Sequence, residues 1–324
     1  MSVIKNVSFI VIAKNEESSL PKCLNSITNL NLENCEVVCV DSCSTDKTLQ
    51  IMHDYAKCSS FFKIKVLVEC KNAAEARNMG KKEASKKYYY FIDGDVELNL
   101  PFIEKALKEM QSSDICAVVG GLDEIVYDDS TGIPKTEKYA RSYYAKKTKL
   151  ISWGGIFIAK AESVSVVGDY DERFFRCQDL DYSIRFADLY EMVALPISMG
   201  IHHTGEYKNR PGLFLKKGFV LNVGMLARKH HKKSGFLKIW YDRNKTIMWG
   251  GGIEILVLLL FVLAVFSNLA KIALLLLCSV IFVAEIAYSI FKKQPLQSSL
   301  IIHFVWPVAV LWGYFKEPSI SAEK

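Results

Sequence analysis

The residues with the clearest chemical potential are two aspartates, Asp93 and Asp95, separated by Gly94. They follow the apolar run at 88–92, which predicts a buried strand that ends at the edge of a sheet, with Gly94 giving the backbone room to bend. Two carboxylates this close repel each other, and a cation between them relieves that repulsion. Oxygen ligands favour Mg²⁺ or Mn²⁺, which commonly bridge to a diphosphate. Because Asp-x-Asp also occurs in solvated turns, the motif alone leaves both interpretations open.

Other polar residues follow predicted strands in the same way. The apolar runs at 7–13 and 36–41 predict two more buried strands, and Asn15, Glu17 and Asp41 come at or just after their ends. Predicted helices lie between the strands, and this alternation indicates a mostly parallel sheet. Ligands of such sheets bind beyond the carboxyl ends of the strands. We therefore expect all these side chains to converge at one edge of an α/β fold.

Composition divides the chain into parts of different character. The first part has the mixed texture of an α/β enzyme, whereas long apolar runs dominate from residue 247 onward. The nine cysteines show neither metal-type spacing nor a paired framework, which favours buried thiols in a reducing compartment. Charged residues follow the apolar run at 7–13 without a small-residue cleavage site, so this run predicts a strand and not a signal peptide.

The C-terminal part predicts association with a membrane. Residues 207–246 are strongly basic with interleaved apolar residues, a pattern typical of an amphipathic segment on an anionic membrane surface, and a nucleic-acid partner is not expected. Within 247–315, two stretches are long enough to span a bilayer and a third is a weaker candidate, which leaves two or three spans open. The basic residues that flank these stretches favour the cytoplasmic side of a membrane. We therefore expect an integral membrane protein with a catalytic domain at 1–206 on the cytoplasmic face and a short tail at 316–324.

Four motifs taken together resemble the nucleotide-sugar half of family 2 glycosyltransferases with the GT-A fold. They are Val-Ile-Ala-Lys-Asn-Glu-Glu (11–17), Val-Asp-Ser-Cys-Ser-Thr-Asp-Lys-Thr (40–48), Ala-Arg-Asn-Met-Gly (76–80) and Asp93-Gly94-Asp95, in the family's order and spacing. Farther on, Gly154-Gly155 and the segment 167–181 resemble the family's acceptor half. The resemblance implies a Rossmann-like, mostly parallel GT-A domain, which we expect to be followed by C-terminal transmembrane helices.

The resemblance implies donor-binding roles for Asn15, Glu17, Asp41, Arg77 and Asp93. Asp41 matches the acidic residue that holds the nucleobase, and Glu17 lies where the family often makes another base contact. Arg77 matches an arginine near the base and the diphosphate. Each role has an alternative, since Asp41 suits a strand-end turn and Arg77 suits a surface ion pair.

The resemblance also implies a divalent cation, Mg or Mn. Asp95 would ligate it directly, and Asp93 would contact either the metal or the ribose of the donor. His202 and His203 follow a predicted strand at the place where many relatives supply a third ligand. Which of the two would bind is undecided, and core or solvated histidines are the alternative.

Asp179 falls where the family places its catalytic base. The residue before it is Gln178, whereas the family commonly has glutamate, so one neighbouring negative charge is missing. A carboxylate within reach of an acceptor hydroxyl can take its proton, and a single base without an enzymic nucleophile implies one displacement with inversion. Asp179 also opens a predicted helix, where the helix dipole favours any aspartate. Trp153, before the glycine pair, either stacks on a sugar or fills the core.

We therefore expect an inverting, metal-dependent glycosyltransferase of the hexosyltransferase type. It would transfer a sugar from a nucleotide-diphosphate sugar, most commonly a UDP-sugar, to a hydroxyl of a lipid-linked or cell-surface glycan. One alternative is a polyprenyl-phosphate sugar synthase, whose ionised phosphate acceptor needs no general base. A second alternative is an inactive membrane adaptor that retains the fold. The Gln-x-x-Arg-Trp motif of processive polysaccharide synthases is missing from the sequence, which favours the non-processive type.

Overall fold

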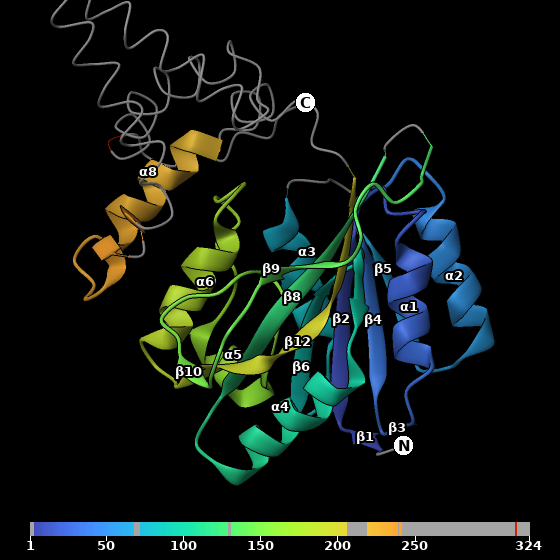
Figure 1. Ribbon diagram of the computed structural model, residues 1–324, viewed down its shortest axis with the longest axis horizontal. Coiled ribbons are helices and arrows are strands. Elements are labelled where there is room, and N and C mark those ends of the chain that lie inside the picture. Colours follow the sequence, from blue (N-terminus) through green and yellow to red (C-terminus); the bar gives the residue numbers. More distant parts are fainter. Residues whose placement is uncertain are drawn as a thin grey trace, which may run out of the picture. The chain divides into compact units, whose positions relative to one another are not determined.

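The computed structural model describes residues 3–67, 72–128, 131–205, 219–238, 240, 241 and 315. The chain divides into two compact units, the first within Met1–Glu206 and the second within Tyr207–Ile320. Every residue predicted to belong to a functional site lies in the first unit, which is an α/β domain (Figure 1).

The strands predicted at 7–13 and 36–41 are confirmed to the residue. The strands of the first unit are β1 (Ile4–Lys5), β2 (Val7–Ala13), β3 (Leu32–Glu33), β4 (Glu36–Asp41), β5 (Phe62–Val66), β6 (Tyr88–Asp93), β7 (Val96–Leu98), β8 (Ala117–Tyr127), β9 (Tyr139–Ser142), β10 (Thr148–Lys149), β11 (Phe157–Lys160) and β12 (Met192–Gly205). Its helices are α1 (Leu20–Thr28), α2 (Thr48–Cys58), α3 (Ala73–Glu83), α4 (Leu100–Ser112), α5 (Ala161–Val167) and α6 (Gln178–Ala187).

The main sheet is mixed, so the prediction of a mostly parallel sheet is confirmed only for β6-β2-β4-β5 and for the pair β8 and β12. Its strand order is β10-β12-β8-β11-β6-β2-β4-β5, with β7 paired to β12 and β9 paired to β8. Strands β6, β2, β4 and β5 run parallel, β8 and β12 run parallel, and β11 lies antiparallel between β6 and β8. In this register Ala13 lies beside Asp41, and Ile12 lies beside Asp93. The two aspartates therefore flank the carboxyl end of β2.

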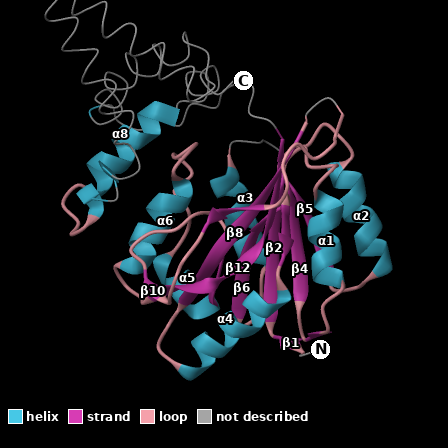
Figure 2. Cartoon of the chain, viewed as in Figure 1, coloured by secondary structure: helices cyan, strands magenta, loops and turns pink. Residues whose placement is uncertain are grey.

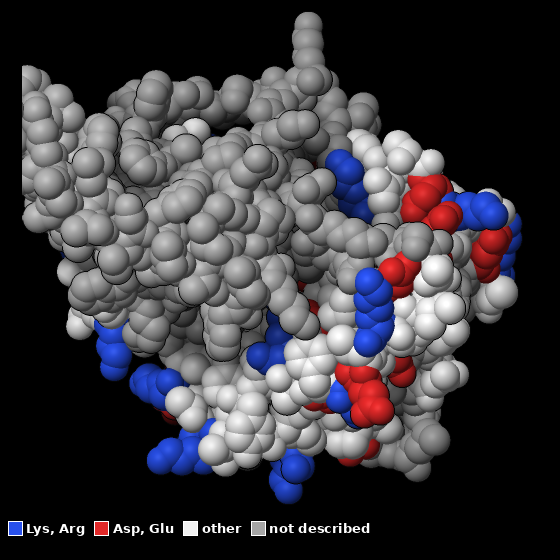
Figure 3. Space-filling view, turned by 45° about the horizontal axis from the view of Figure 1, so that its top comes forward, with Lys and Arg blue, Asp and Glu red and all other residues white. Residues whose placement is uncertain are grey.

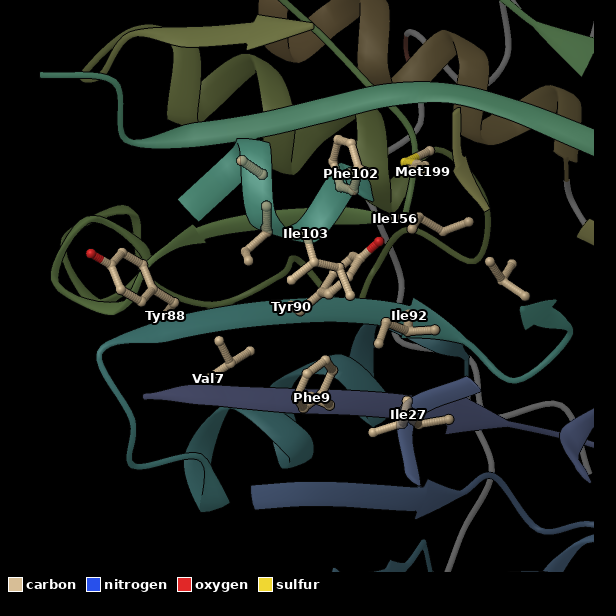
Figure 4. Close-up of a cluster of buried hydrophobic side chains, with 14 of the residues drawn as sticks. Val7, Phe9, Ile27, Tyr88, Tyr90, Ile92, Phe102, Ile103, Ile156 and Met199 are labelled. Carbon is tan, nitrogen blue, oxygen red and sulfur yellow. The ribbon is translucent and has the colours of Figure 1, made fainter. Parts of the chain in front are cut away.

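Helices cover both faces of the sheet (Figure 2). Apolar residues of α1, α2 and α4 pack on one face, and those of α3, α5 and α6 pack on the other. The apolar residues of β6 pack on both faces of the sheet. Tyr88, Tyr90 and Ile92 belong to the core on the face covered by α1, α2 and α4 (Figure 4), whereas Tyr89 and Phe91 belong to the core on the other face. Successive side chains of a strand point to opposite faces, so only a strand buried on both sides needs an unbroken apolar run. The buried strand predicted from the run at 88–92 is confirmed, and β6 ends one residue later at the half-buried Asp93.

Ion pairs join basic and acidic side chains over much of the described surface. The basic segment around β9 and β10 is an example, because Lys135 pairs with Asp128 at 3.1 Å and Lys147 with Glu109 at 2.5 Å. Figure 3 shows acidic and basic side chains close together on the right of the view. Such pairing lowers the net field that the surface presents to a charged partner.

The expectation of C-terminal transmembrane helices, and of an integral membrane protein with its catalytic domain on the cytoplasmic face, is corrected by the structure. In the part of the chain that the structure describes, no helix combines the length and the apolar character needed to cross a bilayer. The segments predicted to span it, within 247–315, lie outside the described residues except for Phe315. The structure supports the α/β fold without these helices.

Helix α8 (Phe219–His230) belongs to the second unit. Val223 and Leu226 are buried, whereas Arg228 and Lys229 are exposed. The helix thus has buried apolar and exposed basic residues, whereas the amphipathic membrane-interface segment at 207–246 stays a prediction, because many of its residues lie outside the described ranges.

Candidate active site

Asp41 ends β4 and is almost completely buried, with 1% of its surface exposed. Its Oδ2 accepts a hydrogen bond of 3.1 Å from the backbone N–H of Ser44. Its Oδ1 is buried and has no hydrogen-bond partner among the described residues. A buried acceptor without a partner costs about 1 to 3 kcal/mol, which a ligand N–H placed there would recover.

Asn15 and Glu17 follow β2, and both bind the neighbouring loop. The carboxamide Oδ1 of Asn15 accepts from the backbone N–H of Thr45 at 2.8 Å, and Asn15 has a left-handed backbone with φ of 57°. The carboxylate of Glu17 accepts from the backbone N–H of Lys47 at 3.1 Å. The structure thus brings both residues to the expected edge but engages their side chains in joining the two loops. Their donor contacts stay a prediction.

Arg77, on α3, is buried with 4% of its surface exposed, so its interpretation as a surface partner is wrong. Its Nη2 donates to Asp93 Oδ1 at 2.6 Å, and its Nε and Nη1 have no hydrogen-bond partner among the described residues. The backbone at Gly155 approaches so closely that a Cβ there would lie 2.2 Å from Arg77 Nη2. Glycine at 155 therefore makes room for the guanidinium beside Asp93.

Gly94 serves close packing and not an unusual bend. Its φ lies outside the left-handed region, and its N–H donates to the carbonyl of Ile12 at 2.9 Å. A Cβ on Gly94 would lie 2.8 Å from the Cβ of Ala13. The glycine thus lets the turn between Asp93 and Asp95 pack against the end of β2.

Asp95 faces His202, which lies within β12 and not after a strand as expected. The Nε2 of His202 is 2.9 Å from Asp95 Oδ2, and the other carboxylate oxygen of Asp95 is buried without a partner among the described residues. Burial disfavours protonation of His202, but the hydrogen bonds to Asp95 and Glu124 outweigh it and raise the pKa of His202. As placed, the described residues contain no cluster of three His, Cys, Asp or Glu side chains that would hold a metal ion. The unpartnered oxygen of Asp95 and the facing imidazole would nevertheless suit a divalent cation.

His203 points to the opposite face of β12. Its Nδ1 lies 2.9 Å from the hydroxyl of Tyr127, and its Nε2 lies 3.0 Å from Glu97 Oε2. Burial is the main cause of a lowered pKa of His203, with Glu97 opposing it. The carboxylate of Asp95 is therefore contacted by the imidazole of His202, whereas His203 joins a separate polar network.

Asp179 lies in the first turn of α6, as predicted, and its Oδ1 accepts from the backbone N–H of Leu180 at 2.9 Å. A Cβ on Gly154 would lie 3.9 Å from its Oδ2, so the glycine pair runs past both Asp179 and Arg77. Burial raises the pKa of Asp93; Arg77 opposes this rise, and the charges of Asp95 and Asp179 add to it. Asp179 thus lies close enough to Asp93 for their charges to interact.

The structure also gives the surroundings of Trp153, for which the sequence left two interpretations open, and of Glu16, for which the sequence predicted no role. Trp153 is 5% exposed and packs on Phe157, with ring centroids 4.9 Å apart, so it belongs to the core. Glu16, which had no predicted role, has its pKa raised to about 7, first by burial and then by the charge of Asp95. Its Oε2 accepts from Ser19 Oγ at 2.5 Å. Glu16 lies within the motif at 11–17, but the sequence does not indicate that its side chain is half-buried.

Comparisons with known proteins agree with this fold. Residues 8–165 match the family described as Glycosyl transferase family 2. Glycosyltransferase AglE of Haloferax volcanii is 24% identical over 257 residues, which cover 74% of this chain and 81% of AglE. A putative teichuronic acid biosynthesis glycosyltransferase of Bacillus subtilis, TuaG, is 29% identical over 129 residues, covering 40% of this chain and 51% of TuaG.

Solved structures show a similar fold. The crystal structure of S. aureus TarS 1–349 in complex with UDP-GlcNAc aligns with a TM-score of 0.52 at 17% identity, and covers 71% of this chain and 75% of that one. The α/β domain described above is therefore GT-A-like. Residues 8–165, just under half of the chain, thus resemble a family 2 glycosyltransferase domain, and the enzyme is a glycosyltransferase.

Proposed function

We propose that this glycosyltransferase moves a sugar from a UDP-sugar to a hydroxyl of a glycan acceptor in one displacement that inverts the anomeric carbon. The observation that carries the proposal is the gathering of Asp41, Arg77, Asp93 and Asp95 around the carboxyl ends of β4, β2 and β6, with Asp179 beside them. TarS, a structural neighbour, was solved with UDP-GlcNAc, which supports a UDP-sugar as the first donor to test.

Two buried and unsatisfied groups would bind the donor. The Oδ1 of Asp41 is an acceptor for a nucleobase N–H, and the Nε and Nη1 of Arg77 are donors for diphosphate oxygens. Hydrogen bonds to charged groups contribute about 1.5 to 3 kcal/mol each. Because Asp93 holds Arg77 at 2.6 Å, the guanidinium is already oriented before the donor binds.

Asp95 and His202 would hold the divalent cation, Mg²⁺ or Mn²⁺, with Asp93 close by. When bound, such an ion neutralises the negative charge that develops on the departing diphosphate. The geometry favours His202 over His203, because only the imidazole of His202 faces the carboxylate of Asp95.

Asp179 would take the proton of the acceptor hydroxyl. The acceptor oxygen then forms the new bond to the anomeric carbon, the bond from that carbon to the diphosphate oxygen breaks, and the nucleoside diphosphate leaves. The enzyme would be non-processive, in keeping with its sequence. Its acceptor would be a surface glycan or a lipid-linked glycan, and relatives named for glycan biosynthesis, such as TuaG, support a glycan acceptor.

The test is release of nucleoside diphosphate by the full-length chain. The assay combines a panel of UDP- and GDP-sugars, Mn²⁺ or Mg²⁺ and glycan acceptors with and without a lipid anchor. We expect release from one donor that needs the cation and is lost in Asp95→Ala but not in Asp54→Ala, a matched change at an exposed aspartate. Release that is equal with EDTA, or equal in both variants, would refute the metal role, and a product with the donor's anomeric configuration would refute inversion.

A further inference from the structure

We propose that Glu124 is the positioning residue that prepares His202 to bind the cation. The inference rests on the proposed function, since it assigns an outer contact of the metal site proposed above. Glu124 lies in β8, and in the parallel pairing of β8 with β12 its register partner is His202. Nothing in the sequence near Glu124 marks it, because residues 124 and 202 meet only through this pairing.

The carboxylate of Glu124 is held at both oxygens. Its Oε1 lies 3.0 Å from His202 Nδ1 and 3.2 Å from Arg141 Nη1, and its Oε2 accepts from the hydroxyl of Tyr139. Tyr139 and Arg141 both come from β9, which pairs with β8. The side chain of Glu124 is only 13% exposed. A carboxylate fixed in this way can fix the ring that it contacts.

The contacts of His202 Nδ1 decide which ring nitrogen carries the hydrogen. Nδ1 lies between Glu124 Oε1 and Arg141 Nη1, the latter at 2.9 Å. A carboxylate only accepts and a guanidinium only donates, so Nδ1 can satisfy one of them. If Nδ1 bears the hydrogen, it donates to Glu124, and Arg141 still reaches Glu124 itself.

The consequence appears at the other nitrogen of the ring. With the hydrogen on Nδ1 and donated to Glu124, Nε2 is left with a lone pair directed at Asp95, 2.9 Å away, where the cation would lie. With Nδ1 accepting from Arg141, Nε2 would carry the hydrogen and could not bind a metal. Carboxylate partners of metal-binding histidines act in this way, and their loss typically weakens metal affinity by about 10- to 100-fold.

The test measures Mn²⁺ binding to the full-length chain without donor, by electron paramagnetic resonance titration. Glu124→Gln keeps the shape of the side chain but removes its charge, and we expect Mn²⁺ to bind about 10- to 100-fold more weakly. The matched control is Asp123→Asn, which changes the adjacent carboxylate of β8, a partner of Lys138 at 3.9 Å. We expect its Mn²⁺ affinity to match that of the unmodified chain. Equal affinity in Glu124→Gln, or equal losses in both variants, would overturn the proposal.

Two further measurements separate this inference from the proposed function. In a His202→Ala background, Glu124→Gln should have no additional effect on Mn²⁺ affinity, and a full additional loss would contradict action through His202. If the unmodified chain binds no Mn²⁺, or if the Asp95→Asn variant binds Mn²⁺ as tightly as the unmodified chain, the proposed metal site is wrong. If binding depends on Asp95 but not on Glu124, only the positioning role is wrong.

A second variant keeps the proposal testable if Glu124→Gln does not fold. Tyr139→Phe removes the hydroxyl that holds Glu124 Oε2, at a residue that is 43% exposed. We expect a several-fold loss of Mn²⁺ affinity at an unchanged thermal midpoint, and an unchanged affinity would contradict the role of Glu124.

Discussion

Replacement of Gly155 by alanine tests whether the site depends on the close approach of this backbone to Arg77. The new Cβ would lie 2.2 Å from Arg77 Nη2, 3.1 Å from its Cζ and 3.4 Å from Asp93 Oδ2. Ordinary contact begins near 3.4 Å, so the guanidinium must retreat from 2.2 Å to at least 3.4 Å, which is about 1.2 Å. Arg77 is 4% exposed, and the centroid of the Tyr170 ring lies 5.8 Å from its Cζ, so the guanidinium would move within a buried environment.

The displacement should cost stability and, to a larger extent, donor affinity. Overpacking of a filled interior typically costs about 1 to 3 kcal/mol, and we expect a loss in this range from urea unfolding. The shift of the guanidinium should lengthen or break the 2.6 Å hydrogen bond from Arg77 to Asp93. Loss of one hydrogen bond from Arg77 to the diphosphate removes about 1.5 to 3 kcal/mol, equivalent to roughly 10- to 100-fold in affinity.

The matched control is Gly154→Ala, one residue earlier on the same segment. There the nearest atom to a new Cβ is Asp179 Oδ2 at 3.9 Å, an ordinary contact. We expect this variant to unfold and to bind UDP like the unmodified chain when calorimetry measures the affinity. If Gly155→Ala behaves like Gly154→Ala in both assays, the close approach of residue 155 to Arg77 does not constrain the site.

Three further changes test the base, the half-buried Glu16 and the turn. Asp179→Asn should lower kcat by about 10²- to 10⁴-fold and leave UDP affinity unchanged, because only the proton acceptor is lost; a near-normal rate in steady-state assays would instead indicate an ionised phosphate acceptor. Glu16 has a folded pKa of about 7 against an ordinary value of 4.5, so the folded state without metal loses stability as pH rises through about 7. The Glu16→Gln variant should lack this loss of stability, which we expect to be about 1 to 2 kcal/mol after screening by solvent. Urea unfolding at pH 5 and pH 8 measures the loss, and the same pH dependence in the variant and the unmodified chain would contradict this role of Glu16. Gly94→Ala should destabilise the chain by about 1 to 3 kcal/mol in thermal unfolding, since its Cβ would meet Ala13 at 2.8 Å, and an unchanged midpoint would show that the turn yields.

The sequence alone determined the framework of the site. The runs ending at Ala13, Asp41 and Asp93 are continuous, apolar and bounded by turn residues, so their positions follow from local composition. Parallel strands put their carboxyl ends on one edge, and this rule placed Asp41 and Asp93 correctly around the end of β2. The sequence also identified the helix that carries Asp179 in its first turn.

Only the tertiary structure decided which side chains face one another. Adjacent residues of a strand point to opposite faces, so His202 and His203 are equivalent in sequence until β12 is paired, and that pairing sets His202 against Asp95 and Glu124. Burial, likewise, is a sum of contacts from distant segments. These contacts bury Arg77, for which the sequence left a surface ion pair open, and they bury Trp153 in the core. Local sequence carries no record of such contacts, because the residues that make them are far apart along the chain.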